Sequence, residues 1–184
     1  ELDVFNERGR TADAQGIEPV TVALFSDKSA AGKIDTAGMP WKGLNVAKRI
    51  GRIKNDSAQL SKLHTTSPAD YEVAVKNLYG RLRDTYERVV EEIIFRDIVR
   101  RGTDVIQTQL LRYVRLSDAL AIRFHEGMTR ANTHSHDNPA ADTVPVPTPD
   151  EFASDIADLE LLIASLKADS DAAEIARPQM KPKK

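Results

Sequence analysis

Cysteine is absent from this sequence of 184 residues. Its absence excludes disulfides, zinc sites made of thiolates and a cysteine nucleophile, and it fits a reducing compartment, so we expect a cytoplasmic protein. Long apolar runs are absent too, since none approaches the ~20 residues that a membrane helix requires. The first ten residues are polar and charged, which is not the pattern of a signal peptide. We therefore expect no membrane partner.

Aromatic residues are scarce at 5%, and the formal net charge is only -2. Hydrophobic residues make up 41% and charged residues 29%, which is the composition of a globular protein rather than a disordered one. The core must therefore be mostly aliphatic. The nearly balanced charge excludes the basic bias of a dedicated nucleic-acid coat, although a local basic patch is compatible with it.

The first 43 residues have the pattern of a terminal α/β unit followed by a loop. Residues 1–15 are typical of the end of a helix. The β-branched residues 20–25 predict a short buried strand that needs partners from missing sequence or from elsewhere in the chain. Residues 26–43 predict a loop, which we expect Trp41 to anchor to the body. Because the chain begins within a helical pattern, we expect Glu1 to be a boundary inside a longer protein.

Helical periodicity dominates the rest of the chain. It predicts a short amphipathic helix over 45–54, a long core helix over 69–100 and a further helix from 117 to about 128. The residues Thr-Pro-Asp-Glu at 148–151 form a capping box that opens the last helix. Residues 105–116 alternate like a strand but also suit a helix, and we favour a helix weakly.

These elements predict a mainly α fold. We expect a helical, bundle-like domain over 44–169, preceded by the short α/β unit at 1–43 and followed by a flexible tail at 170–184.

Arg83 and Glu87 are one helical turn apart on the polar side of the long predicted helix. Such a pair could cleave a phosphodiester, since Glu can take a proton while Arg stabilises the developing charge. An Arg and a Glu at this i,i+4 spacing more often form a surface ion pair than a catalytic site, so the spacing alone favours the ion pair.

Polar side chains also gather in and before the loop predicted over 132–149. Arg130 and His136 have the R-x₅-H spacing of metal-independent HEPN ribonucleases, in which His moves a proton and Arg binds phosphate. His134, His136 and Asp137 could instead bind zinc, although further ligands at metallohydrolase spacing are absent. The third alternative, which we favour, is a loop whose polar groups bond the local backbone.

A basic stretch without any acidic residue runs from 42 to 54. Its cations could follow a phosphate backbone, although a solvated helix face is the commoner explanation; they are Lys42, Lys48, Arg49, Arg52 and Lys54. No nucleotide site is complete, because Ala31-Gly32-Lys33 lacks the first glycine of a phosphate loop.

Several short blocks, in order along most of the chain, resemble one family. The blocks lie at 38–44 (Gly-Met-Pro-Trp-Lys-Gly-Leu), 48–50, 78–83, 86–92, 127–128 and 136–137. They resemble the C-terminal parts of bacterial AAA-family ATPases of the SMC-like, ABC-type class, to which anticodon nucleases and other anti-phage defence proteins are related. The resemblance implies that residues 1–43 end an ATPase head and that the ATP and Mg²⁺ site lies upstream, with no cofactor in this segment.

The resemblance also implies functions. In the anticodon-nuclease branch, an Arg, a Glu four residues later and a distant His form the RNA-cleaving site. Arg83, Glu87 and His136 would take these roles, with Arg130 as a supporting phosphate binder. Our leading hypothesis is therefore a helical region of an SMC-like ATPase in nucleic-acid surveillance or phage defence.

Two alternatives stay open at this stage. The helices could form a non-catalytic module that dimerises the ATPase or docks an effector protein, which an exposed apolar surface would favour. A stand-alone metallohydrolase using His134 and His136 is the weaker one.

Overall fold

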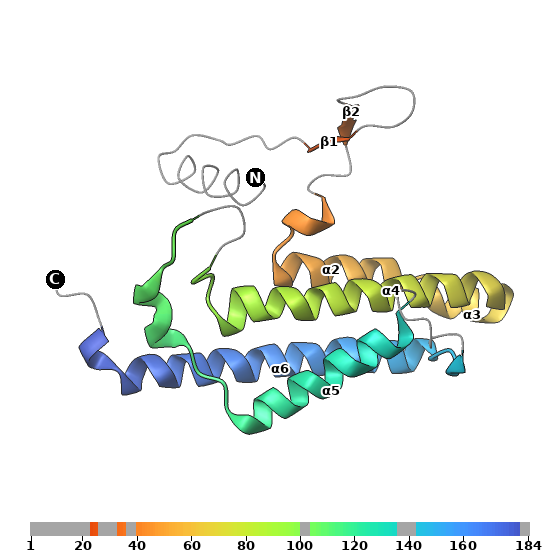
Figure 1. Cartoon of the computed structure of the whole chain (residues 1–184). Coiled ribbons are helices and arrows are strands. Elements are labelled where there is room, and N and C mark those ends of the chain that lie inside the picture. The colour runs from red at the N-terminus through yellow and green to blue at the C-terminus, as the bar shows by residue number, and fades with distance from the viewer. Residues whose placement is uncertain (1–22, 26–32, 36–39, 100–103, 136–142, 181–184) are drawn as a thin grey trace.

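The structure is a computed structural model that describes residues 23–25, 33–35, 40–99, 104–135 and 143–180. The helices are α2 (Val46–Ser57), α3 (Leu60–Thr66), α4 (Pro68–Val89), α5 (Asp118–His134) and α6 (Pro149–Ala176). Shorter turns are the 3-10 helices η1 (Trp41–Gly43), η3 (Thr108–Tyr113) and η5 (Pro178–Met180) and the π-helical η2 (Val90–Ile94). The prediction of a mainly helical, bundle-like domain is confirmed (Figure 1).

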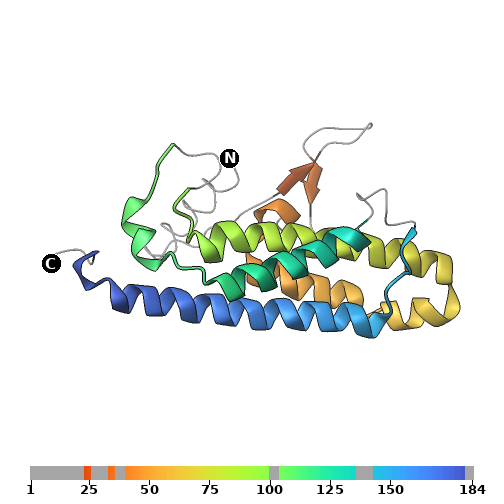
Figure 2. The ribbon, with the colours of Figure 1, turned by 60° about the horizontal axis from the view of Figure 1, so that its bottom comes forward.

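Helix α4 is the centre of this bundle. It contacts α2, α3, α5 and α6, and the long helices run side by side along it (Figures 1 and 2). Its apolar residues recur once per turn, as the sequence predicted, and Val75, Leu82 and Val89 are at most 1% exposed. Helix α6 buries its own predicted stripe, from Phe152 to Leu166, against the same core.

The long predicted helix ends earlier than residue 100. Helix α4 stops at Val89 and continues as the wider η2, after which Arg96 and Asp97 have φ angles of 52° and 55°. Left-handed backbone of this kind cannot continue a right-handed helix, so the chain turns away here. The glycine predicted to end the helix, Gly102, lies outside the described residues.

Capping side chains define two helix starts, and the sequence predicted the capping box of α6. Asn45 accepts a hydrogen bond from the backbone of Lys48 at the start of α2. Thr148 and Glu151 form the reciprocal capping box at the start of α6. The start of α6 therefore follows from local side-chain chemistry.

The strand at the N-terminal end is present but is not buried. Strand β1 (Ala23–Phe25) pairs antiparallel with β2 (Lys33–Asp35), with Leu24 opposite Ile34. Leu24 is 65% exposed, because nothing among the described residues covers it. The predicted loop at 26–43 is thus wrong at β2 and at η1. The helix expected over 1–15 lies outside the described residues.

Other boundaries also differ from the sequence prediction. Residues 105–116 combine both alternatives, since Ile106 pairs with Val99 in an isolated antiparallel bridge and η3 follows. Helix α5 continues past 128 to His134, inside the predicted loop. Helix α6 continues to Ala176 with Ser170 and Ala173 buried, so the predicted flexible tail does not begin at 170.

None of the helices within the described ranges combines the length and apolar character needed to cross a membrane.

Glycine at position 127 allows α5 to lie close to α4. A Cβ atom at Gly127 would fall 2.8 Å from Cζ of Tyr86 and closer still to its hydroxyl oxygen, and Tyr86 is 2% exposed. We expect Gly127→Ala to lower the free energy of unfolding by about 1–3 kcal/mol, because a buried ring must move. Urea denaturation followed by circular dichroism measures this.

Gly51 in α2 supplies the matched control, because a Cβ there meets nothing within 4 Å. Gly51→Ala should stabilise by about 0.5–1 kcal/mol through helix propensity. Equal stabilisation by both substitutions would show that α5 does not pack closely on Tyr86.

Candidate functional site

The structure brings Arg83 and Glu87 together. Nη2 of Arg83 lies 3.1 Å from Oε1 of Glu87, and the two side chains are 29% and 43% exposed. Both are thus accessible from solvent, as either a catalytic pair or a surface ion pair requires. His136 lies outside the described residues, so its approach to this pair stays a prediction.

Arg130 is held by carboxylates on α6. Its Nε lies 3.1 Å from Oδ1 of Asp155, and Nη2 lies 3.7 Å from Asp158. Burial lowers the pKa of Arg130, but the hydrogen bond to Asp155 raises it overall. The guanidinium that the sequence suggested as a phosphate binder is therefore already paired with two anions.

A pocket of about 360 Å³ lies beside this ion pair, between α4, α5 and the start of α6. The Tyr79 hydroxyl donates a 2.7 Å hydrogen bond to Asp155, and the rings of Tyr79 and His134 are 5.0 Å apart. Val144, Pro145, Val146 and Pro147 form an apolar wall. The sequence analysis suggested Arg130 and His134 as functional residues. It could not indicate that Tyr79 meets Asp155, because these residues are 76 positions apart and share no local pattern.

Burial changes the acid–base properties of this pocket. It raises the pKa of Tyr79 strongly, helped by the hydrogen bond to Asp155, so the phenol stays protonated. Burial also lowers the pKa of His134, although Asp155 and Glu151 oppose the effect. His134 is therefore a neutral imidazole near pH 7.

No group of three or more metal-ligating side chains occurs within the described ranges. Of the three residues suggested for zinc, His134 lines the pocket, while His136 and Asp137 lie outside those ranges.

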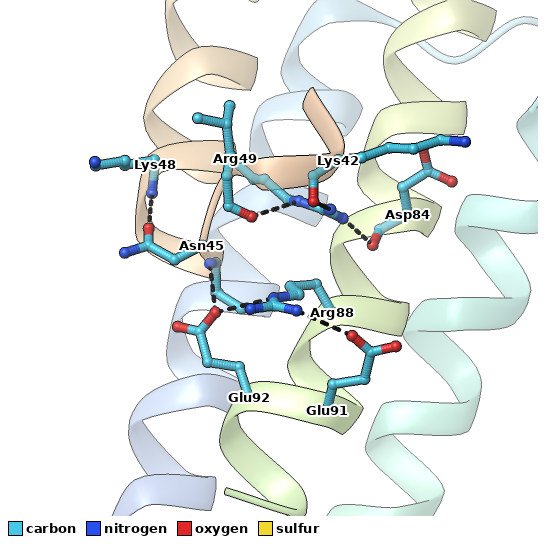
Figure 3. Close-up of polar contacts among 10 residues, drawn as sticks. Lys42, Asn45, Lys48, Arg49, Asp84, Arg88, Glu91 and Glu92 are labelled. Atoms are coloured by element: carbon cyan, nitrogen blue, oxygen red, sulfur yellow. Dashed lines mark hydrogen bonds and ion pairs between the residues drawn. The ribbon is translucent and has the colours of Figure 1, made fainter. Parts of the chain in front are cut away.

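The predicted basic face of α2 is wrong at Arg49, which is 7% exposed (Figure 3). Its guanidinium donates hydrogen bonds to the backbone carbonyls of Leu44 (3.0 Å), Asp84 (2.7 Å) and Lys42 (3.3 Å). It also lies 5.1 Å from the centre of the Trp41 ring. Burial lowers the pKa of Arg49, and nearby Arg88 lowers it further. Arg49 thus joins η1, α2 and α4 instead of facing solvent.

Three further hydrogen bonds complete this junction. Trp41 Nε1 donates a 3.0 Å hydrogen bond to Asp84, which confirms that Trp41 anchors its segment to the body. Glu92 accepts hydrogen bonds from the Val46 backbone and from Arg88 (Figure 3). The carboxylate therefore caps the N-terminus of α2, where negative charge is favourable.

The other cations of the basic stretch differ in their pairing. Lys54 lies 2.7 Å from Glu160 of α6 and is neutralised by it. Lys42 and Lys48 are exposed and Arg52 is half-buried, with no ion pair to a described side chain. Of the cations in this basic stretch, Lys42, Lys48 and Arg52 therefore keep a charge that no described carboxylate compensates.

A feature that the sequence did not reveal lies at one end of the bundle. We define the η3 end as residues 95–99, 104–113 and 175–180. Its segments are joined by the Val99–Ile106 bridge and by hydrogen bonds from Arg177 to the carbonyls of Leu111 and Val114 (Figure 1). Seven of the twelve exposed large apolar side chains of the described chain lie here: Phe95, Val99, Val105, Ile106, Leu111, Ile175 and Met180.

No protein-family model, no curated protein and no solved structure matches this chain.

Arg49 is the first residue to test by mutation. Arg49→Met should lower the free energy of unfolding by about 2–4 kcal/mol, because three backbone carbonyls in a buried region lose their donor. Lys48→Met is the matched control on the adjacent, exposed position and should change stability by less than about 0.5 kcal/mol. Thermal or urea denaturation measures the free energy of unfolding of both variants. An equal loss of stability in Arg49→Met and Lys48→Met would contradict the assigned role of Arg49.

His134 should make stability fall in mild acid. Its folded pKa lies below its unfolded value of about 6.5, so the unfolded state binds the proton more readily. The contribution of neutral His134 to the free energy of unfolding is present above pH 6.5 and is lost as the pH falls through the folded pKa. We expect His134→Gln to flatten the dependence of the melting temperature on pH just below 6.5. His125→Gln, at an exposed position, is the control. If His134→Gln left the dependence of the melting temperature on pH unchanged, the assigned role of His134 would be wrong.

Proposed function

We propose that this chain is a non-catalytic helical docking module of a larger cytoplasmic protein, such as the SMC-like ATPases whose C-terminal parts it resembles. The observation that supports the proposal is the gathering of large exposed apolar side chains at the η3 end. Val99 is 64% exposed, Ile106 62% and Ile175 78%. Surfaces of this kind are typical of sites where a protein meets another protein.

The state of the polar groups also supports a docking role. Arg130, Arg49 and Lys54 are engaged by carboxylates or by backbone carbonyls, so they have little capacity left for a phosphate. The residues 1–43 would join the module to an ATPase head, and ATP and Mg²⁺ would bind there, outside this segment. Under this proposal the ATPase passes its signal through the apolar end to a protein partner.

One observation favours a second candidate, an RNA-cleaving effector of a nucleic-acid surveillance or defence system. His134 lies beside Tyr79, and Tyr79 is one turn from Arg83 on α4. The Arg83–Glu87 pair is formed and accessible from solvent, as a cleavage site requires. His136, the third residue of the suggested site, lies outside the described residues.

Cleavage of labelled tRNA and single-stranded RNA separates the two candidates. The parent protein, supplied with ATP and Mg²⁺, should leave both RNAs intact if the module is non-catalytic. If the second candidate is correct, wild type cleaves RNA, and Glu87→Ala and His136→Ala each reduce cleavage by at least about 100-fold, because each removes a proton-transfer group. Lys76→Ala, elsewhere on α4, is the control. Cleavage lost in both site variants, with their circular dichroism unchanged, would overturn the docking proposal in its non-catalytic form.

A further inference from the structure

We infer that the η3 end is a homodimer interface, in which a second copy of this chain covers the exposed apolar side chains. This inference rests on the proposed docking function and names its partner. It starts from the local structure, since the Val99–Ile106 bridge is isolated. Such a small two-stranded pairing is marginal in water unless another element packs on it. Opposite residues of an antiparallel pair point to the same face, so Val99 and Ile106 form one exposed apolar pair.

The charges at this end restrict the kind of partner. Three arginines at this end or next to it face carboxylates of α6: Arg96 lies 3.6 Å from Asp171, Arg112 3.8 Å from Glu174, and Arg115, just after η3, 3.4 Å from Asp169. The η3 end also carries Arg177, which donates to backbone carbonyls, and the carboxylates of Asp97 and Asp104, so its charges of the two signs nearly balance. A surface with nearly balanced charges offers little to a nucleic acid or to a strongly charged protein. It can meet an identical surface without net repulsion, and the chain as a whole carries a net charge of only -2.

The exposed area suits a dimer. At about 100 Å² for each large apolar side chain, the seven side chains offer on the order of 700 Å². Each partner of a standard-size interface contributes roughly 600–1,000 Å². A two-fold dimer needs one such self-complementary patch and no second surface, and it is the commonest form of homo-oligomer.

The side chains of this patch are also free to be replaced without harm to the fold. Val99 and Ile175 are exposed and belong to no core cluster, so a lysine at either position leaves the packing of the bundle unchanged. Matched controls exist on the same helices or with the same residue type. Val73, near the start of α4, is 62% exposed, and Leu161, near the middle of α6, is 61% exposed.

Sedimentation velocity of the 184-residue chain over a range of concentrations tests the inference. We expect a species of twice the 20.4 kDa mass of one chain, with a dissociation constant of about 1 μM or tighter. Val99→Lys and Ile175→Lys should each raise that constant at least tenfold, whereas Val73→Lys and Leu161→Lys should leave it unchanged. A dimer that the two controls disrupt, or that the two end variants leave intact, overturns the inference.

A fluorescent dye for apolar surfaces, anilinonaphthalene sulfonate, separates failure of the dimer from failure of the docking function. A chain that stays monomeric to about 100 μM, yet binds the dye at a site lost in Val99→Lys, overturns self-association and leaves the η3 end open for a different protein. A monomer that binds no dye at this end overturns both the homodimer and the docking function.

Discussion

The burial of α4 on several sides is the constraint on which the rest of this structure depends. A long helix that is covered by α2, α3, α5 and α6 needs apolar side chains around much of its circumference, and it needs small residues on a neighbouring helix that approaches it closely. The chain meets the first need with an aliphatic stripe and the second with Gly127 against Tyr86. The covering helices come from both sides of α4 in the sequence, so α4 is buried by contacts that extend over the whole region from α2 to α6.

The polar groups of the bundle mostly serve this packing. Arg49 donates hydrogen bonds from α2 to the backbone of α4 and η1, and Glu92 caps the start of α2 from η2, which follows α4. The pairs Lys54–Glu160 and Arg130–Asp155 connect α6 to α2 and α5. A cation that is held in this way loses more by turning to a passing phosphate than an unpaired surface cation does, because its carboxylate or carbonyl partner would be left unsatisfied. The proposed docking function therefore rests on the exposed apolar side chains of the η3 end and not on the charged surface.

That end differs from the rest of the molecule in how its backbone is organised. Regular α-helix gives way to a π turn, to left-handed residues at Arg96 and Asp97, to one β-bridge and to a 3-10 helix. Irregular segments of this kind expose side chains that a helix would turn toward the core. They are held in place by α6, through Ser170, which donates to the Tyr113 carbonyl, and Arg177, which donates to carbonyls at the end of η3. Hydrogen bonds from Ser170 and Arg177 thus hold the backbone of these segments, while their apolar side chains are exposed to solvent.

The sequence by itself determined the features that depend on neighbours along the chain. Helical spacing identified α2, α4 and α6, and local capping chemistry identified the start of α6, because i,i+4 contacts and caps involve residues only a few positions apart. It also placed Arg83 and Glu87 together for the same reason. The sequence could not tell that Arg49, one of several cations on α2, is the buried one, or that Tyr79 meets Asp155. Burial and pairing over 35 or 76 residues depend on how the helices pack, as does the exposure of Val99 and Ile106. Only the tertiary structure decided these points, because periodicity describes one helix at a time and the partner of each face lies far away in the chain.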